Sequence, residues 1–133
     1  MGKKIRVVIA DDHAVLRESL SALLAAQKDF EVAGTASNGG EAVEVVQRTQ
    51  PDVLVLDLFM PNGDGFEVVD VLRQERSRAI ALIVYSGREL SAADRQALML
   101  GPTRHFTKTR SSEEQLFAAV RELMGELTGE EGP

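Results

Sequence analysis

The sequence predicts an α/β fold: a doubly wound parallel sheet of five strands, flanked by five helices. Two runs, 7–9 and 53–56, contain only Val, Ile and Leu, and a run without polar alternation is typical of a strand buried on both faces. Segments with helical spacing separate the strand candidates, which predicts parallel strands joined by right-handed crossovers. Four strand candidates end on reactive polar residues, which a parallel sheet would bring to one edge.

Strand and helix candidates alternate along the chain. The strand candidates cover residues 5–10, 31–36, 53–56, 80–85 and 104–107. The first helix begins near residue 14, and the later helices cover 41–48, follow the turn-rich loop 60–65, cover 92–100, and begin at Ser112. Gln115 lies three residues after Ser112, which is the spacing of a capping box.

The first helix shows how a buried side is assigned from spacing. It begins near Ala14, with Asp12 as the expected N-cap residue. Its leucines lie at offsets of four, seven and eight, so a helix would place them on one stripe facing the sheet. This stripe consists of Leu16, Leu20, Leu23 and Leu24.

Length and composition indicate one domain. The chain has 133 residues, of which 44% are hydrophobic, and this is enough to form a single core. We assign residues 1–127 to the domain. A flexible tail is expected over 128–133, within a frayed end that starts at Gly125 and is rich in Gly and Glu.

The charge balance argues against nucleic acid and membrane as direct partners. The 21 acidic residues outnumber the 15 Lys and Arg, the net charge is -6, and no basic block is present. No apolar run is long enough to span a bilayer, and the first residues lack a secretory signal. The absence of cysteine excludes disulfides and thiolate metal sites. We expect a cytoplasmic protein.

The polar residues at the predicted strand ends form the candidate site: Asp11, Asp12, Asp57, Ser86 and Lys108. Three carboxylates in one crevice repel each other, and a hard divalent cation removes that repulsion. Mg²⁺ suits the pocket because it binds one or two carboxylates and keeps positions for water and phosphate oxygens. Lys108 and Ser86 supply a positive charge and a hydroxyl donor for the remaining phosphoryl oxygens. Asp57 ends the central strand below a loop, so it is the best candidate nucleophile.

These motifs resemble the receiver domains of two-component response regulators over about residues 5–127. The matching segments are 5–13, 53–61, Ser86 and 106–108. The resemblance implies a flavodoxin-like fold and the transfer of a phosphoryl group to Asp57 from the phosphohistidine of a histidine kinase or phosphotransfer protein. The sequence of residues 10–13 and 36–39 is most similar to that of NarL-like receivers, which are attached to a LuxR-type DNA-binding domain.

The resemblance also implies a ligand set for the metal. Asp12, Asp57 and the backbone carbonyl of Phe59 would bind Mg²⁺, and Asp11 would assist through a water molecule.

A switching mechanism is implied by the same resemblance. Ser86 and Lys108 would hold the phosphoryl group, and Phe106 would turn inward as an aromatic switch. The face formed by the fourth helix, the last strand and the fifth helix would then change shape. The implied partners are a downstream protein or an output domain outside this sequence, and a second copy of the chain on activation.

Two positions depart from the receiver pattern. Pro102 stands where receivers usually have Ala, which bears on the end of the fourth helix and the path into the last strand. Thr109 stands where many receivers have Pro, so a cis peptide after Lys108 is not expected. Phe59 and Arg88 occupy positions that, in this family, affect the lifetime of the phosphoryl group.

The two histidines are assigned no role. Neither His13 nor His105 has a second ligand at helical spacing, and we expect both to face solvent.

Three other functions stay open as alternatives. A small Mg²⁺-dependent aspartyl phosphohydrolase normally carries Asp-x-Asp, whereas Asp57 is followed by Leu58 and Phe59. A flavodoxin-like nucleotide-binding module needs glycine in the first strand-to-helix turn, where residues 11–14 contain none. A non-phosphorylated interaction module would show no Mg²⁺-dependent labelling. We expect no enzymatic activity beyond phosphoryl transfer to Asp57 and its slow loss.

Overall fold

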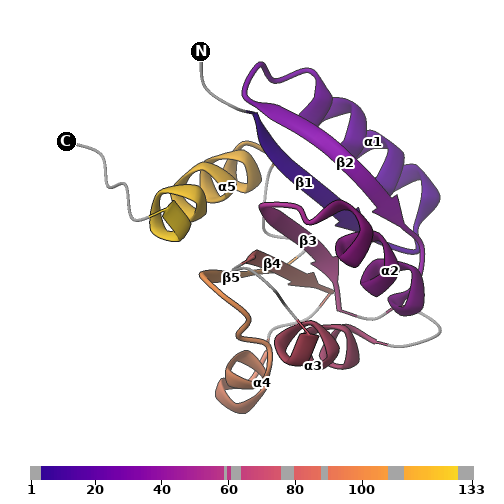
Figure 1. Ribbon diagram of the computed structural model, residues 1–133, viewed down its shortest axis with the longest axis vertical. Helices are drawn as coiled ribbons and strands as arrows, with labels where there is room; N and C mark the ends of the chain where they lie inside the picture. The colour runs from indigo at the N-terminus through magenta and orange to yellow at the C-terminus, as the bar shows by residue number, and fades with distance from the viewer. Residues whose placement is uncertain are drawn as a thin grey trace.

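The computed structural model describes residues 4–58, 60, 64–75, 80–87, 90–107 and 113–128. One parallel sheet has the strand order β2-β1-β3-β4-β5, and helices alternate with the strands along the chain (Figure 1). This arrangement confirms the predicted fold class. The strands are β1 (Ile5–Ala10), β2 (Phe30–Ala36), β3 (Val53–Asp57), β4 (Ala81–Ser86) and β5 (Thr103–Thr107). The helices are α1 (Ala14–Ala25), α2 (Gly39–Thr49), α3 (Gly65–Glu75), α4 (Ala92–Ala97) and α5 (Glu113–Thr128).

Both faces of the sheet are covered, as the continuous apolar runs predict. Side chains of β1, β3 and β4 alternate between two core clusters. One cluster packs against α2, α3 and the end of α4, and the other packs against α1 and α5. The central strand β3 is buried along its whole length, since residues 53–56 are fully buried and Asp57 is almost fully buried. Its final residue, Asp57, is therefore held at a fixed place on the sheet edge.

The bounds of α2 have a local chemical cause. The Asn38 side chain accepts a hydrogen bond from the Glu41 amide at 2.9 Å, and Glu41 in turn accepts one from the Ser37 amide at 2.8 Å. The helix ends at Gln50, whose φ of 48° is left-handed. It therefore begins two residues earlier than the sequence predicts.

The start and the buried side of α1 differ from the prediction. The N-cap residue is His13, whose side chain makes no capping hydrogen bond, so the assignment of Asp12 as the cap is wrong. The Asp12 carboxylate instead lies 3.3 Å from the ring of His13. Leu20 and Leu24 are buried, but Leu23 is 40% exposed. The contact of α1 with the sheet is narrower than the predicted stripe, because residues four apart align most closely along a helix.

The last two helices also differ from their predicted lengths. α4 ends at Ala97, three residues early, because Arg73 of α3 donates hydrogen bonds to the carbonyl oxygens of Ala97 and Met99 at 2.9 and 2.6 Å. α5 continues through Gly125 to Thr128, so this part of the expected frayed end is helical. The predicted capping residue Ser112 lies outside the described residues. No helix in the described part of the chain is both long enough and apolar enough to span a membrane.

Gly101 and Pro102 fit the path from α4 into β5. A Cβ atom at position 101 would overlap the backbone carbonyl oxygen of Ile80, so this close approach of two backbones requires glycine. Pro102 lacks an N–H, but its carbonyl accepts a hydrogen bond from the Leu82 amide at 2.8 Å. This hydrogen bond links the start of β5 to β4, and it uses the carbonyl of Pro102 and not the missing N–H. The peptide bond after Lys108 lies outside the described residues.

Candidate functional site

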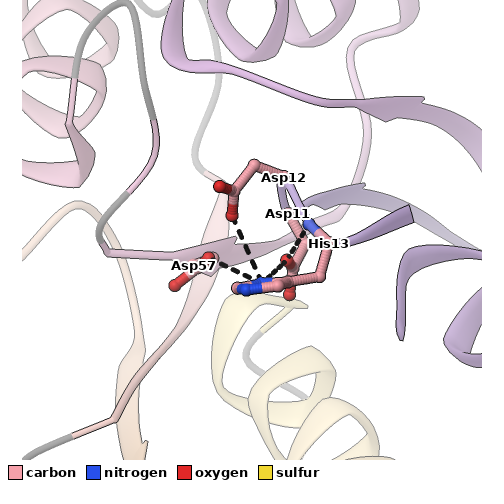
Figure 2. Close-up of side chains that lie close together, drawn as sticks. All are labelled: Asp11, Asp12, His13 and Asp57. Atoms are coloured by element: carbon pink, nitrogen blue, oxygen red, sulfur yellow. Dashed lines mark hydrogen bonds and ion pairs between the residues drawn. The ribbon is translucent and has the colours of Figure 1, made fainter. Parts of the chain in front are cut away.

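Four ionisable side chains gather at the carboxyl ends of β1 and β3 (Figure 2). Asp11, Asp12 and His13 follow β1, and Asp57 is the last residue of β3. One ligand atom from each residue lies within 4.8 Å of the other three. The two strands are adjacent and parallel, so the residues at their carboxyl ends meet at one edge of the sheet. The structure thus brings together the three carboxylates that the sequence places at this edge.

Asp11 is fully buried and is held by its neighbours. Its amide donates to the Ala36 carbonyl at 3.0 Å, which continues the pairing of β1 with β2. Its Oδ1 accepts a hydrogen bond from the His13 amide at 2.8 Å and lies 3.0 Å from His13 Nδ1. Its Oδ2 accepts a hydrogen bond from the Tyr85 hydroxyl at 3.4 Å. These contacts fix the orientation of the carboxylate before any ligand binds.

The other two carboxylates differ in their exposure to solvent. Asp57 is 2% exposed, whereas the side chain of Asp12 is 31% exposed. Placing a carboxylate at the end of a buried apolar strand is costly unless nearby groups or a ligand compensate its charge. The cluster therefore has a buried floor that contains Asp57 and a rim that contains Asp12.

Tyr85 is buried beside this cluster. It pairs with Asp57 in the register of β3 and β4. Burial raises the pKa of its phenol far above the ordinary value of 10.0, and the charges of Asp11 and Asp57 raise it further. At neutral pH, Tyr85 is therefore an uncharged hydrogen-bond donor to Asp11.

The comparison with protein families agrees with this geometry. Residues 7–121 match the family described as the response regulator receiver domain. The chain belongs to this family. It is a receiver domain of two-component response regulators, and its five-stranded parallel sheet has the strand order of the fold that this family implies. The carboxylate cluster lies at the carboxyl edge of that sheet.

Known proteins resemble this receiver domain over nearly its whole length. A protein-glutamate methylesterase/protein-glutamine glutaminase from Pyrococcus abyssi is 33% identical over 95% of the chain, and the nitrate/nitrite response regulator protein NarL from Escherichia coli K12 is 32% identical over 91%. The receiver domain matches 33% and 56% of these two relatives. The response regulator domain of Thermotoga maritima CheB aligns with a TM-score of 0.81 and 29% identity, over 92% of this chain and 98% of that one. The predicted similarity to NarL-like receivers is confirmed, and methylesterase receivers are similar to the same degree.

The remaining predicted site residues lie on or beyond the neighbouring strands. Ser86 is the last residue of β4 and is 1% exposed. Phe106 of β5 pairs with Tyr85 and packs, partly buried, against the core cluster under α1 and α5. Lys108 and Phe59 are outside the described residues, so their predicted contacts stay predictions.

The donor set fits the Mg²⁺ ion that the family implies. Asp11, Asp12 and Asp57 offer the hard oxygen ligands that Mg²⁺ requires. Opposite ligands of an octahedral Mg²⁺ ion are about 4.2 Å apart, and the ligand atoms of the cluster lie within 4.8 Å of one another. The carboxylates are therefore close enough together for one ion to contact more than one of them.

Two residues of the site were assigned no role from the sequence. His13 was expected to face solvent, and its side chain is 64% exposed, but its Nδ1 faces the carboxylates. Tyr85 gave a usable signal, since parallel pairing places the residue before Ser86 next to Asp57. His13 is solvent-exposed as expected, but the expectation for His105 was wrong: the residue is partly buried, and burial followed by the charge of Arg95 lowers the pKa of its ring.

Proposed function

We propose that Asp57 accepts a phosphoryl group from the phosphohistidine of a histidine kinase or a phosphotransfer protein. The observation that supports this most is the burial of Asp57 at the end of the central strand, within a cluster of three carboxylates. A carboxylate oxygen of Asp57 attacks the phosphorus, the P–N bond breaks, and its electron pair leaves with the imidazole of the donor. The product is an acyl phosphate on Asp57, which water later hydrolyses.

The other carboxylates prepare Asp57 for this reaction. Asp12, Asp57 and the backbone carbonyl of Phe59 are proposed to hold Mg²⁺, with Asp11 acting through a water molecule. The ion supplies positive charge that neutralises the carboxylates and the phosphoryl oxygens. Asp11 keeps its place because it is fully buried and accepts hydrogen bonds from His13 and Tyr85. Asp12 lies at the rim, where it can adjust to the incoming group.

The proposed output is a change in the surface formed by α4, β5 and α5. Ser86 and Lys108 bind the phosphoryl oxygens, and their movement lets Phe106 turn inward. The positions of Ser86 and Phe106 support this route, because Ser86 ends the strand beside Asp57 and Phe106 pairs with Tyr85. The changed surface then contacts a downstream protein, an output domain of the kind that longer relatives carry, or a second copy of the chain.

We further propose that the domain acts through these contacts and does not turn over an external substrate. The methylesterase relative is an enzyme by its name, but this receiver domain matches only 33% of its length. The phosphoryl transfer to Asp57 and the hydrolysis of the resulting acyl phosphate are then the only chemistry that the domain carries out.

Phosphorylation in the absence of a kinase tests the acceptor. Acetyl phosphate and Mg²⁺ should add one phosphoryl group to the chain, as measured by intact mass, and chelation of Mg²⁺ should prevent this. Asp57→Asn should abolish the addition, because the amide is a poor nucleophile. Asp70→Asn removes an exposed acid of α3 and should be labelled like the wild type. Labelling of Asp57→Asn to the wild-type extent would reject the proposal.

A further inference from the structure

His13 places a ring nitrogen beside all three carboxylates of the receiver site. Its Nδ1 lies 3.0 Å from Asp11 Oδ1, 3.3 Å from Asp12 Oδ1 and 4.0 Å from Asp57 Oδ2, along the dashed lines in Figure 2. His13 is the N-cap residue of α1, yet its side chain makes no capping hydrogen bond. The ring is therefore placed by the carboxylate cluster and not by the helix end.

Two of these separations match the distances between ligands of one octahedral ion. With metal–ligand bonds of about 2.1 Å, neighbouring ligands are about 3.0 Å apart and opposite ligands about 4.2 Å apart. Asp12 and Asp57 are the direct carboxylate ligands of the proposed function, and the distances from Nδ1 to them, 3.3 and 4.0 Å, are close to these two values. The 3.0 Å contact with Asp11 Oδ1 is a hydrogen-bond distance, which fits a residue that acts through water and is no direct ligand. The ring nitrogen thus lies where a further ligand of a bound cation would lie.

The chemistry of the ring allows this role. A neutral imidazole has one nitrogen that carries a proton and one whose lone pair can bind a metal. The His13 side chain is 64% exposed, so the ring can keep its proton on Nε2 in contact with water while Nδ1 binds the ion. Imidazole suits first-row transition ions, whereas Mg²⁺ favours oxygen ligands.

We propose that Nδ1 of His13 is a direct ligand of the divalent ion in this receiver domain and gives the site an added preference for transition ions over Mg²⁺. The proposal rests on the proposed function, because it requires the carboxylate metal site. It adds a residue that determines which ion the site selects.

Electron spin echo envelope modulation of Mn²⁺ bound to the full chain observes the ligand directly. In protein labelled with [¹⁵N]histidine, we expect a ¹⁵N coupling from a bound ring in the wild type and its loss in His13→Ala. His105→Gln changes the other of the two histidines and should keep the coupling. A wild-type spectrum of bound Mn²⁺ without any histidine coupling would overturn the inference and leave the proposed Mg²⁺ site intact. If neither Mn²⁺ nor Mg²⁺ bound, the metal site of the proposed function would fail as well.

Calorimetric titration measures the consequence for ion choice. His13→Ala should weaken Co²⁺ binding by about tenfold or more and change Mg²⁺ binding by less than about twofold, since only the transition ion gains from a nitrogen ligand. His105→Gln should change neither affinity. If His13→Ala instead tightened both ions equally, the ring would be a counter-charge that the metal displaces, and the inference would be wrong.

Discussion

At the scale of single residues, Tyr85 connects the parts of the site without contributing a charge. Its hydroxyl donates to Asp11 at 3.4 Å, and its backbone pairs with Asp57 on one side and with Phe106 on the other. Tyr85 is therefore a common neighbour of Asp57, Asp11 and Phe106. A neutral donor at this place stabilises a carboxylate without competing with a metal for it.

The raised pKa of Tyr85 predicts a loss of stability in alkaline solution. In the unfolded chain the phenol loses its proton near 10.0, whereas burial keeps it protonated in the folded domain. Above that pH the unfolded state binds fewer protons than the folded state, so the free energy of unfolding falls as pH rises. Urea denaturation from about pH 9 to about pH 11 should show a steeper fall for the wild type than for Tyr85→Phe. Equal falls in stability for the two proteins would contradict the raised pKa of Tyr85. No other tyrosine contributes, because the chain has only one.

The carboxylates of the site could be predicted from sequence, but the ring that faces them could not. Asp11 and Asp57 each end an apolar run of strand length, and parallel pairing then places them together. His13 carries no such pattern, because its orientation depends on a side-chain rotation toward Asp11 and Asp12 that spacing does not encode. Phosphate-binding roles of Ser86 and Lys108 stay predictions.

At the scale of elements, the link between α4 and β5 depends on a contact between two backbones. Gly101 packs against the carbonyl of Ile80, which precedes β4, and the Pro102 carbonyl then accepts a hydrogen bond from the Leu82 amide of that strand. β5 carries Phe106, so the position of the proposed switch depends on this link. Pro102 therefore departs from the usual receiver sequence without interrupting the sheet.

A substitution at Gly101 tests this contact. A methyl group there overlaps the Ile80 backbone, so we expect Gly101→Ala to lower the free energy of unfolding by about 1–3 kcal/mol. Gly40→Ala is the matched control, because position 40 is helical and its Cβ would meet only the Asn38 side chain at 3.5 Å. That change should be neutral or stabilise by about 0.5–1 kcal/mol. A Gly101→Ala variant as stable as the wild type in urea denaturation would show that the backbones separate easily.

The elements themselves follow from the sequence more closely than their ends do. The predicted strands 5–10 and 53–56 match β1 and β3 to within one residue, because burial on both faces leaves a local signature of continuous apolar residues. The end of α4 depends instead on Arg73, which lies 24 and 26 residues away in sequence from the carbonyls that it binds. The spacing of apolar residues in the helix contains no trace of such a contact.

At the scale of the whole molecule, the cluster of carboxylates opposes folding. The chain has a net charge of -6, and three acids converge at one sheet edge, two of them almost completely buried. Like charges held this close destabilise the folded state relative to the unfolded chain, in which they separate. A cation that binds only the folded state must therefore stabilise the domain.

Thermal unfolding with and without Mg²⁺ measures this coupling. At a concentration ten times its Kd, Mg²⁺ should raise the free energy of unfolding by about 1.4 kcal/mol, with ionic strength held constant. Asp57→Asn removes one charge, so this variant should be more stable than the wild type without Mg²⁺ and should gain less from the ion. Asp70→Asn should respond like the wild type. An equal gain for Asp57→Asn would place the ion elsewhere.

The identity of the phosphorylated residue is the central claim, and borohydride reduction tests it most directly. Reduction converts an acyl-phosphorylated aspartate to homoserine, which tandem mass spectrometry locates. Trypsin separates the candidates, because Asp11 and Asp12 fall in peptide 7–17 and Asp57 falls in peptide 49–73. After incubation with acetyl phosphate and Mg²⁺, we predict homoserine at position 57. Homoserine at position 11 or 12, or at no aspartate, would contradict the account.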